Sequence, residues 1–406
     1  MLIDFKVTNF RSFKDNTEFS MERGNYIRKN KSNVIKVGNC ELLKSSVFFG
    51  ANASGKTNIL NALMCLRYQI LKQTISENEP LIMETFAYNK DNTEFEINFI
   101  KNGKKFQYKL IYNSNEFVYE KLTEDKKTIL LREYQEFTVL PEQLKPIKLN
   151  IRKNQNLLFF AQQNNVSDAK EAFQWFEEDI IFISTDHIQN ELFSVLNNDV
   201  FKEKFLSFLQ SADFNIVDYE IKKKMIKVPD ISINFENNIP TPGDVKMVNQ
   251  EFYDMYCTHK GENGEYQIHF DQESEGTKVF ITIALHILHN ENSEKLILID
   301  EFNRSFHLEL ATSLLEVFNY EKQKNQFIVT SHELALMDSN LRQDQIWFAE
   351  KNIYGASRLY SIYDFEDISQ KRSDYGYMKR YLEGRFGATQ IVNKKSLLDI
   401  IGDRSG

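Results

Sequence analysis

The chain carries one glycine-bounded motif between an apolar run and an amphipathic run: Gly50-Ala51-Asn52-Ala53-Ser54-Gly55-Lys56-Thr57. It matches G-x-x-x-x-G-K-[ST], the pattern of a phosphate-binding loop, or P-loop. In such a loop the backbone N–H groups face the phosphates, and the glycines allow close approach. We expect Lys56 to reach the β- and γ-phosphates of a nucleotide and the Thr57 hydroxyl to bind Mg²⁺. The loop and the residue after it, Asn58, are the predicted nucleotide-binding residues.

The surroundings of the motif agree with this interpretation. Residues 44–50 end in the apolar run Val47-Phe48-Phe49, which predicts a buried strand. Residues 57–72 place apolar side chains along one stripe, which predicts a helix. A P-loop needs a strand before it and a helix after it, and the N-terminus of that helix favours bound phosphate.

Composition limits the functions that the chain can have. Its 406 residues are enough for two or three domains, or for one large domain with inserted lobes. Lys and Arg number 50 and Asp and Glu 58, so the net charge is 50 − 58 = −8, whereas nucleic-acid-binding faces usually carry a basic excess. Contact with nucleic acid is therefore expected to be local or made through a partner. Three cysteines far apart in the sequence, Cys40, Cys65 and Cys257, exclude a disulfide framework and fit the cytoplasm.

No membrane contact is expected. The first ten residues alternate polar and apolar side chains, unlike the apolar core of a signal peptide. The longest apolar stretch, residues 279–288, is roughly half as long as a bilayer-spanning helix needs to be.

An acidic motif follows a second apolar run. Residues 295–301 read KLILIDE, that is, four apolar strand residues followed by Asp300 and Glu301, which is the Walker B pattern. Asp300 is expected to orient Mg²⁺ or its waters, and Glu301 to polarise the attacking water as a general base. Thr57 and Asp300 are thus the predicted metal ligands.

Two further motifs flank the Asp-Glu pair. Downstream, residues 326–332 (QFIVTSH) predict a strand that ends near His332, a side chain suited to sensing the γ-phosphate or the attacking water. Lys56, Glu301 and His332 form the predicted catalytic set. Upstream, residues 273–277 (ESEGT) precede an apolar helix, and Ser274 and the Gly276 amide at the start of that helix are candidates for contacting phosphate. Ser274 is also a favourable N-cap residue for this helix in the absence of any ligand.

The apolar pattern divides the chain into three parts. Residues 1–160 are predicted to form an N-terminal half with the P-loop and an antiparallel β lobe, because three strand-like runs at 94–124 are separated by hairpin signals. Residues 161–245 are predicted to form a mainly helical insertion, with a Pro-, Asn- and Gly-rich loop at 229–245. Residues 246–406 are predicted to form a C-terminal half, where helices and short apolar strands alternate from Gly276 onward. The predicted fold class is α/β with a mixed or parallel sheet core.

The order P-loop, Ser-Glu-Gly, Asp-Glu and strand-terminal His resembles that of the ABC-type head of the SMC-like ATPases. More narrowly, the chain resembles prokaryotic AAA ATP-binding proteins of the RloA/AbiLi type, which occur in phage-defence and restriction-linked operons. The matching segments span residues 1 to 390 and comprise 9–13 (NFRSF), 50–58, 212–216 (ADFNI), 273–277, 296–307, 329–333, 345–351 and 381–388 (YLEGRFGA).

This resemblance implies head-to-head pairing of two subunits with ATP and Mg²⁺ between them, and Ser274 and Gly276 of one subunit facing the P-loop of the other. It implies Arg11 as a phosphate or ribose contact, although a solvated strand arginine is the plain alternative. It also implies a separate effector protein, often a nuclease. The chain departs from the family where a glutamine is expected to couple to the γ-phosphate, since Ala87-Tyr88-Asn89 falls there instead.

Two functions remain open at this point. The first is a cytoplasmic ATPase that forms a homodimer or larger homo-oligomer with ATP and acts as the sensor or scaffold of a phage-defence complex. The second is a repair or recombination ATPase that clamps DNA itself, for which the basic run Lys222-Lys223-Lys224 is the sequence candidate. The signature ESEGT, rather than the transporter-type LSGGQ, argues against a membrane transporter subunit.

Overall fold

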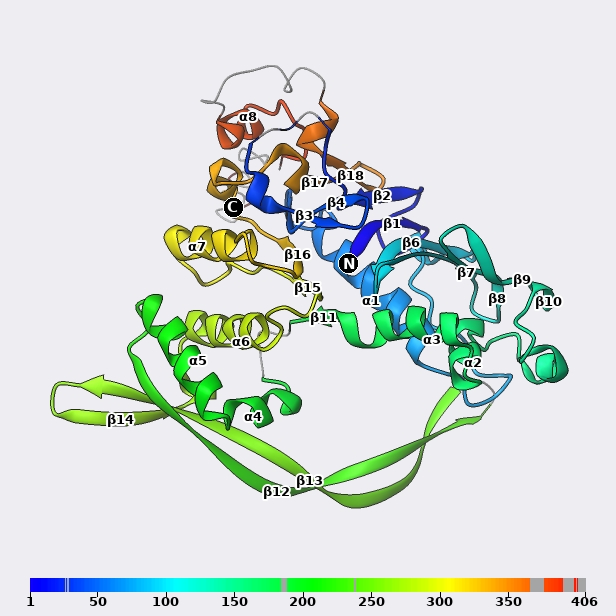
Figure 1. The fold of residues 1–406 in the computed structure, drawn as a ribbon, viewed down its shortest axis with the longest axis horizontal. Helices are drawn as coiled ribbons and strands as arrows, with labels where there is room; N and C mark the ends of the chain where they lie inside the picture. Colours follow the sequence, from blue (N-terminus) through cyan, green and yellow to red (C-terminus); the bar gives the residue numbers. More distant parts are fainter. Residues whose placement is uncertain are drawn as a thin grey trace.

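The computed structural model describes residues 1–25, 27, 29–183, 188–236, 239–365, 376–389, 398 and 400. Two large sheets and the helices around them form a body, and a long two-stranded ribbon curves along the side of the body opposite helix α8 (Figure 1). No helix in the described ranges is both long and apolar enough to cross a membrane.

The sheet that carries the predicted site has the strand order β11-β15-β16-β5-β17-β18. Its strands are β5 (Ser45–Phe49), β11 (Ile180–Phe182), β15 (Leu296–Ile299), β16 (Gln326–Thr330), β17 (Ile346–Lys351) and β18 (Ser357–Ser361). Neighbours from β11 to β17 are parallel, and β18 is antiparallel to β17. The predicted α/β class with a mixed sheet core is confirmed.

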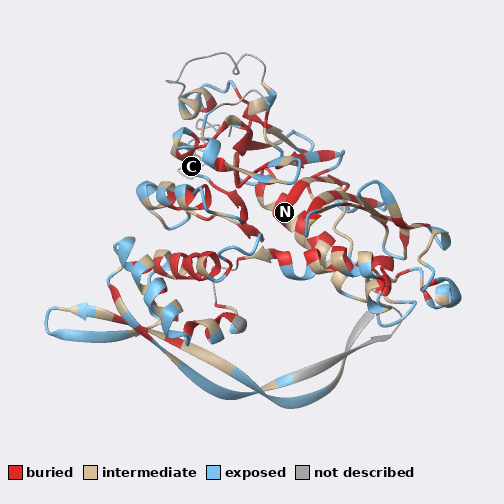
Figure 2. Cartoon of the chain, viewed as in Figure 1, coloured by how far each residue is buried: buried red, intermediate tan, exposed pale blue. Residues whose placement is uncertain are grey.

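Both faces of this sheet are covered, which explains why β15 is apolar at every position. Leu296 and Leu298 belong to one hydrophobic core, whereas Ile297 and Ile299 belong to the other. Successive strand residues point to opposite faces, so a strand between two cores has no polar side. Figure 2 shows these strands as buried.

A second, antiparallel sheet covers one side of helix α1 (Lys56–Leu71). Its order is β10-β9-β8-β7-β6-β1-β2, with β1 (Leu2–Thr8), β2 (Thr17–Ser20), β6 (Thr93–Lys101), β7 (Lys104–Tyr112), β8 (Phe117–Glu124), β9 (Lys127–Glu133) and β10 (Glu136–Val139). Asn102 and Gly103 between β6 and β7 have φ of 50° and 81°, as a tight hairpin turn requires. The antiparallel lobe predicted for residues 94–124 is confirmed.

Helices cover the remaining faces. These helices are α2 (Leu157–Gln163), α3 (Ser167–Gln174), α4 (Asn190–Leu196), α5 (Asp199–Ser211), α6 (Glu275–His289), α7 (Leu308–Phe318) and α8 (Tyr377–Leu382). Strands β3 (Val34–Val37) and β4 (Cys40–Leu43) form a separate antiparallel pair. Residues of α4 to α7 share a core with the face of the central sheet that α1 does not cover. The predicted alternation of helix and strand from Gly276 onward is confirmed by α6, β15, α7 and β16.

The prediction of a mainly helical segment at 161–245 is correct for α3, α4 and α5, but it missed the strand β11 between α3 and α4 and is wrong beyond α5. Residues from 216 onward form β12 (Ile216–Glu236), which pairs with β13 (Ile239–Gly261), and β13 pairs with β14 (Gly264–His269). The lysine-rich stretch at 222–227 has helix-forming residues, but pairing with strand residues 22 to 32 positions further along the chain overrides this local preference. Of the loop predicted at 229–245, residues 229–236 lie in β12 and residues 239–245 in β13, and residues 237 and 238 lie outside the described residues.

A buried ion pair joins the antiparallel sheet to α2. Glu120 and Arg132 are fully buried, with Oε2 and Nη2 at 3.0 Å. The Glu120 carboxylate also accepts hydrogen bonds from the Leu157 and Leu158 backbone N–H groups at 2.8 Å and from the Tyr108 hydroxyl at 2.8 Å. It therefore fixes the first turn of α2 to β7 and β8.

We expect Glu120→Ala to destabilise the fold by about 3–5 kcal/mol, because it leaves the buried Arg132 charge uncompensated. The measurement is the midpoint of urea denaturation followed by circular dichroism. Glu136→Ala, at an exposed position of the same sheet, serves as the matched control and should leave the midpoint unchanged. An equal midpoint for both variants would contradict the assigned role of Glu120.

Candidate functional site

The topology of the central sheet brings three predicted motifs to one edge. Strands β15, β16 and β5 are adjacent and parallel, so their carboxyl ends lie side by side. The P-loop leaves β5, Asp300 follows β15, and His332 follows β16. Ligands of α/β sheets bind at this edge.

Steric contacts explain both glycines of the loop. Gly50 has φ of 146°, and a Cβ there would collide with the Ala349 carbonyl oxygen. Gly55 has φ of 112°, and a Cβ there would lie 2.7 Å from Ser357 Oγ. The backbone of the loop is therefore pressed against β17 and β18, and α1 begins directly after Gly55.

Lys56 is buried inside the loop. Its Nζ donates hydrogen bonds to the carbonyl oxygens of Gly50 at 2.9 Å and Ala51 at 3.0 Å. Burial lowers the pKa of Lys56 to about 8, although the carboxylates of Glu301 and Asp300 oppose this change. Among the described residues, the buried Ser54 hydroxyl nearby has no hydrogen-bond partner. A desolvated cation, an unpaired hydroxyl and a helix N-terminus together suit a phosphate.

Asp300 is placed to serve a metal. Its Oδ1 accepts hydrogen bonds from Thr57 Oγ1 at 3.0 Å and from Thr330 Oγ1 at 2.5 Å. Carboxylate and hydroxyl oxygens are hard ligands that suit Mg²⁺, which usually completes its shell with water and nucleotide phosphate. In the described part of the chain no group of three or more His, Cys, Asp and Glu side chains is arranged to hold a metal. Thr57 and Asp300 thus fit Mg²⁺ only as partners of a bound nucleotide.

Glu301 and His332 face each other at the edge of the site. His332 Nε2 lies 3.5 Å from Glu301 Oε1, and both side chains are about two-fifths exposed, at 42% and 40%. Partial burial, helped by the Lys56 charge, lowers the pKa of His332, while Glu301 acts in the opposite direction. Glu301 has φ of 46° and donates its backbone N–H to Thr330 Oγ1 at 2.7 Å. A carboxylate and a neutral imidazole therefore meet where water has access.

Ser274 and Gly276 lie in a different part of the structure. Ser274 caps α6, since its Oγ accepts the Thr277 N–H at 3.1 Å. A Cβ at Gly276 would lie 2.8 Å from the Ser305 carbonyl oxygen, so only glycine allows this approach. Both residues line a cavity of about 710 Å³ between α5, α6 and α7. Among the described residues, those lining this cavity include none from the P-loop.

The segment before Ser274 is joined to the base of the ribbon. Glu273 Oε1 contacts His259 Nε2 of β13 at 2.6 Å, and both side chains are nearly buried. His259 also stacks on Tyr266 of β14, and Asn215 donates to the Lys260 carbonyl oxygen at 2.8 Å.

Arg11 is already engaged within the chain. Its Nε contacts Glu84 Oε2 at 2.5 Å, and its backbone N–H donates to the Glu84 carbonyl oxygen at 2.6 Å. The next residue, Ser12, contacts the first turn of α1, because its Oγ accepts a hydrogen bond from Asn58 Nδ2 at 2.7 Å. The role of Arg11 as a phosphate or ribose contact remains a prediction.

Sequence reasoning missed three hydroxyl groups that shape the site. Thr330 binds Asp300, Ser12 binds Asn58, and Ser357 Oγ donates to the Ser54 carbonyl oxygen at 2.6 Å. Thr330 was visible as the residue before Ser331-His332 at the end of an apolar strand. No local signal marks Ser357, because it reaches the loop only through the pairing of β17 with β5 and β18.

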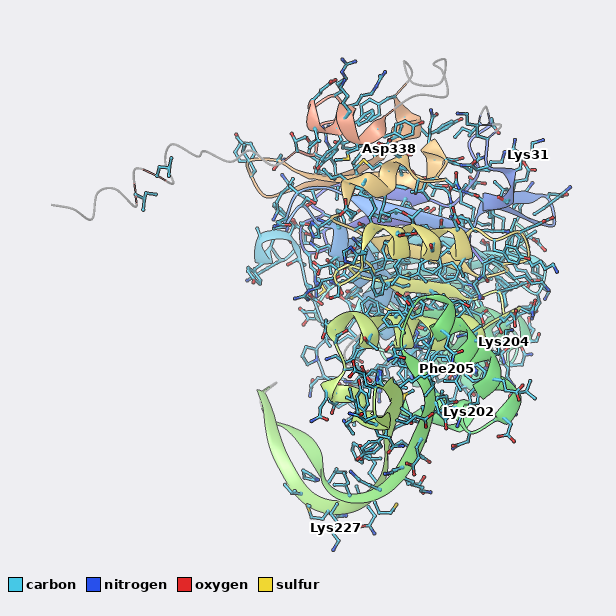
Figure 3. The ribbon with its side chains drawn as sticks, turned by 90° about the vertical axis from the view of Figure 1, so that its left-hand side faces the viewer. Lys31, Lys202, Lys204, Phe205, Lys227 and Asp338 are labelled. Atoms are coloured by element: carbon cyan, nitrogen blue, oxygen red, sulfur yellow. The ribbon has the colours of Figure 1, made fainter. Side chains whose placement is uncertain are left out.

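The basic run at 222–224 is neutralised within the ribbon. Lys222 pairs with Glu220 at 3.4 Å, Lys223 with Glu251 at 2.6 Å, and Lys224 with Asp254. Lys227 lies on the part of the ribbon farthest from the body, whereas Lys202 and Lys204 lie on α5 (Figure 3). Paired lysines offer a phosphate backbone less net charge than the sequence suggests.

Comparison with known proteins identifies one protein family whose sequence model matches most of the chain. The sequence model of the family described as "AAA domain, putative AbiEii toxin, Type IV TA system" matches residues 45–338. No curated protein matches the sequence.

The solved structures that are similar in fold include three SMC head domains. The SMC head domain from Thermotoga maritima is 13% identical, with 89% of this chain and 98% of that chain covered and a TM-score of 0.41. An SMC head bound to the C-winged helix domain of ScpA is 10% identical, with coverages of 89% and 97% and a TM-score of 0.43. The third is an SMC head domain with an extended coiled coil, bound to the C-terminal domain of ScpA derived from Pyrococcus furiosus. It is 10% identical, with 89% of this chain and 96% of that chain covered and a TM-score of 0.42.

The lowered pKa of Lys56 predicts that nucleotide binding takes up a proton. In the free protein Lys56 loses its proton near pH 8, and bound phosphates would raise its pKa again. By linkage, the affinity for ATP should fall about tenfold between pH 7 and pH 9. Calorimetry at pH 8 in two buffers of different ionisation enthalpy measures the proton uptake directly. Lys56→Met is the control and should bind weakly with no such uptake; equal uptake by this variant would contradict the assignment.

Proposed function

We propose that this chain, which belongs to the family described as "AAA domain, putative AbiEii toxin, Type IV TA system", is an ATPase that works between two copies of itself. It binds ATP and Mg²⁺ at the P-loop and hydrolyses the ATP at the interface. The observation that supports this most strongly is the contact of Thr57 with Asp300, 243 residues away, at the edge where the loop and His332 also lie. Side chains suited to phosphate, metal and water are thereby combined in one place.

The residues of the chain have distinct tasks in this proposal. Lys56 gives up its hydrogen bonds to the loop carbonyls and binds phosphate. Mg²⁺, when bound beside Thr57 and Asp300, neutralises phosphate charge. Glu301 accepts a proton from the attacking water, and the neutral His332 donates its single ring N–H to the reacting group.

Two features support a site completed by a second copy. The exposed Glu301 and His332 leave the reacting side of the P-loop open to solvent. The Ser274 hydroxyl and the α6 N-terminus, which suit a γ-phosphate, line a separate cavity. Bringing two chains together head-to-head would place Ser274 and the α6 N-terminus of one copy over the P-loop of the other. Water would then be excluded from the site.

At the level of biology, we propose a cytoplasmic sensor or scaffold subunit of a phage-defence complex with a separate effector, which fits the RloA/AbiLi resemblance. The family description names a toxin–antitoxin system, that is, a system with two components. The DNA-clamping alternative gains no support from the basic run at 222–224, since Lys222, Lys223 and Lys224 are ion-paired. The division into a half at 1–160, an insertion at 161–245 and a half at 246–406 is kept as a proposal about domains.

We expect Glu301→Gln to bind ATP, to hydrolyse it at least 100-fold more slowly, and to accumulate as a dimer, because removal of the general base costs about 10²–10⁴-fold. Mass photometry with and without Mg-ATP measures the dimer.

The matched controls alter Ser274 and Gly276, the residues proposed to contact ATP held by the other copy. Ser274→Arg and Gly276→Ala in the Glu301→Gln background should bind ATP but remain monomeric, since the added Cβ at Gly276 displaces the Ser305 loop. Normal turnover by Glu301→Gln would remove Glu301 as the base. Dimers of the Ser274→Arg variant would remove Ser274 from the interface.

A further inference from the structure

Thr330, the last residue of β16, lies at the centre of the candidate site, but the proposed mechanism gives it no task. Its side chain is fully buried. Ile299 of β15 pairs with Val329 of β16, and the two strands are parallel. The residues that follow this pair, Asp300 and Thr330, therefore lie side by side at the edge of the sheet where the P-loop also lies.

The Thr330 hydroxyl acts both as a donor and as an acceptor. A hydroxyl has one proton to donate, whereas a carboxylate can only accept. The Thr330 proton is therefore donated to Asp300 Oδ1 at 2.5 Å, and its oxygen accepts the Glu301 backbone N–H at 2.7 Å. The Thr330 carbonyl oxygen also accepts the backbone N–H of Phe302, at 3.3 Å. One residue of β16 thus contacts three consecutive residues after β15.

These contacts hold Glu301 in a backbone conformation that a glutamate does not favour. Its φ of 46° lies in the left-handed region, where the Cβ atom crowds the backbone. Such a conformation persists where the surrounding structure enforces it. The Glu301 carbonyl oxygen accepts the Arg304 N–H at 2.9 Å, which is a contact within the same turn. The hydrogen bond to Thr330, by contrast, attaches Glu301 to the central sheet.

The backbone conformation of Glu301 decides where its carboxylate lies. Glu301 Oε1 is 3.5 Å from His332 Nε2 at the solvent-accessible edge, whereas Asp300 contacts Thr57 inside the site. The angle φ describes rotation about the N–Cα bond, so a return to negative φ would swing the Cβ atom and the carboxylate away from this position. Loss of the hydrogen bond to Thr330 would permit that return.

We propose that Thr330 is a positioning residue for ATP hydrolysis, whose hydroxyl holds Glu301 in the conformation that presents its carboxylate to the attacking water. This inference rests on the proposed function and adds to it a residue that acts through the general base rather than on ATP. A displacement of a reacting group by about 1 Å can lower a rate about 100-fold. Asp300 would keep its second hydrogen bond, to Thr57, if the Thr330 hydroxyl were removed.

The test removes the hydroxyl and keeps the shape of the side chain. Thr330→Val should lower kcat for Mg-ATP hydrolysis about 10- to 100-fold and change KM less than about threefold, because the P-loop is unaltered. Thr330→Ser keeps a hydroxyl and should bring kcat back to within about threefold of the unmodified chain. Steady-state release of phosphate from Mg-ATP by the full chain measures both parameters.

Thr282 provides a matched control from the same chain. It is also a buried threonine, but it lies within α6, where its Oγ1 donates to the Lys278 carbonyl oxygen at 2.9 Å. Thr282→Val should leave kcat and KM unchanged. Circular dichroism at the assay temperature checks that each variant is folded. Thr330→Ala is the second variant that removes the hydroxyl, and it should show the same loss of kcat.

A double variant separates an effect on the general base from an effect on the metal side. If Thr330 acts through Glu301, adding Thr330→Val to Glu301→Gln should lower the remaining rate less than about twofold, because residues that act as a unit are not additive. Single-turnover hydrolysis with the protein in excess over ATP measures this slow rate. A further fall of about tenfold would assign the effect to Asp300 and overturn the inference.

The remaining outcomes separate this inference from the proposed function. An unchanged kcat for Thr330→Val, a loss confined to KM, or a loss that Thr330→Ser does not restore would each overturn the positioning role while leaving ATP hydrolysis by the chain established. Absence of hydrolysis by the unmodified chain would instead overturn the proposed function, and this inference with it.

Discussion

The parallel register of β5, β15 and β16 is the constraint on which the candidate site depends. Leu296 pairs with Gln326, and Val329 pairs with Val47, so the three strands end together. Each strand is buried on both faces, and a slip by one residue would exchange the side chains of two different cores. The two cores therefore hold the register, and the register holds the P-loop, Asp300 and His332 within reach of one another.

A second set of contacts fixes the backbone of the loop. Gly50 packs against the Ala349 carbonyl, and the adjacent Glu350 carboxylate accepts the Ala388 N–H at 3.0 Å. Gly387, with φ of 67°, lets the chain approach Glu350, because a Cβ there would lie 2.8 Å from Oε1. The Gly-Arg-Phe-Gly-Ala motif near the end of the described chain thus supports the strand against which the P-loop rests. A loop that is held in this way loses little freedom when it binds phosphate.

Much of the central architecture follows from local sequence, and the reason is physical. A fully apolar strand, a glycine-rich loop and an amphipathic helix each have a short-range signature, as in residues 45–71 and 296–318. The ribbon has no such signature, since residues 216–227 become a strand only through pairing with a segment that ends at Gly261. The contacts of Ser357 and Thr330 with the site likewise depend on which strands are neighbours, and that information is not local. The motif around Arg11 is visible in the sequence, but its ion pair with Glu84 is not, because Glu84 lies 73 residues further along the chain.

The two parts of the proposed composite site are attached to different parts of the fold. The P-loop and Asp300 are fixed by the central sheet, whereas Ser274 follows Glu273, whose carboxylate is held by His259 at the base of the ribbon. A ribbon of two strands is only marginally stable by itself, and here its base is anchored by Phe193 stacking on Tyr253 and by the Tyr219 hydroxyl on the Leu196 carbonyl. Displacement of the ribbon base would consequently act first on the Ser274 end of α6, whereas the P-loop follows β5 of the central sheet.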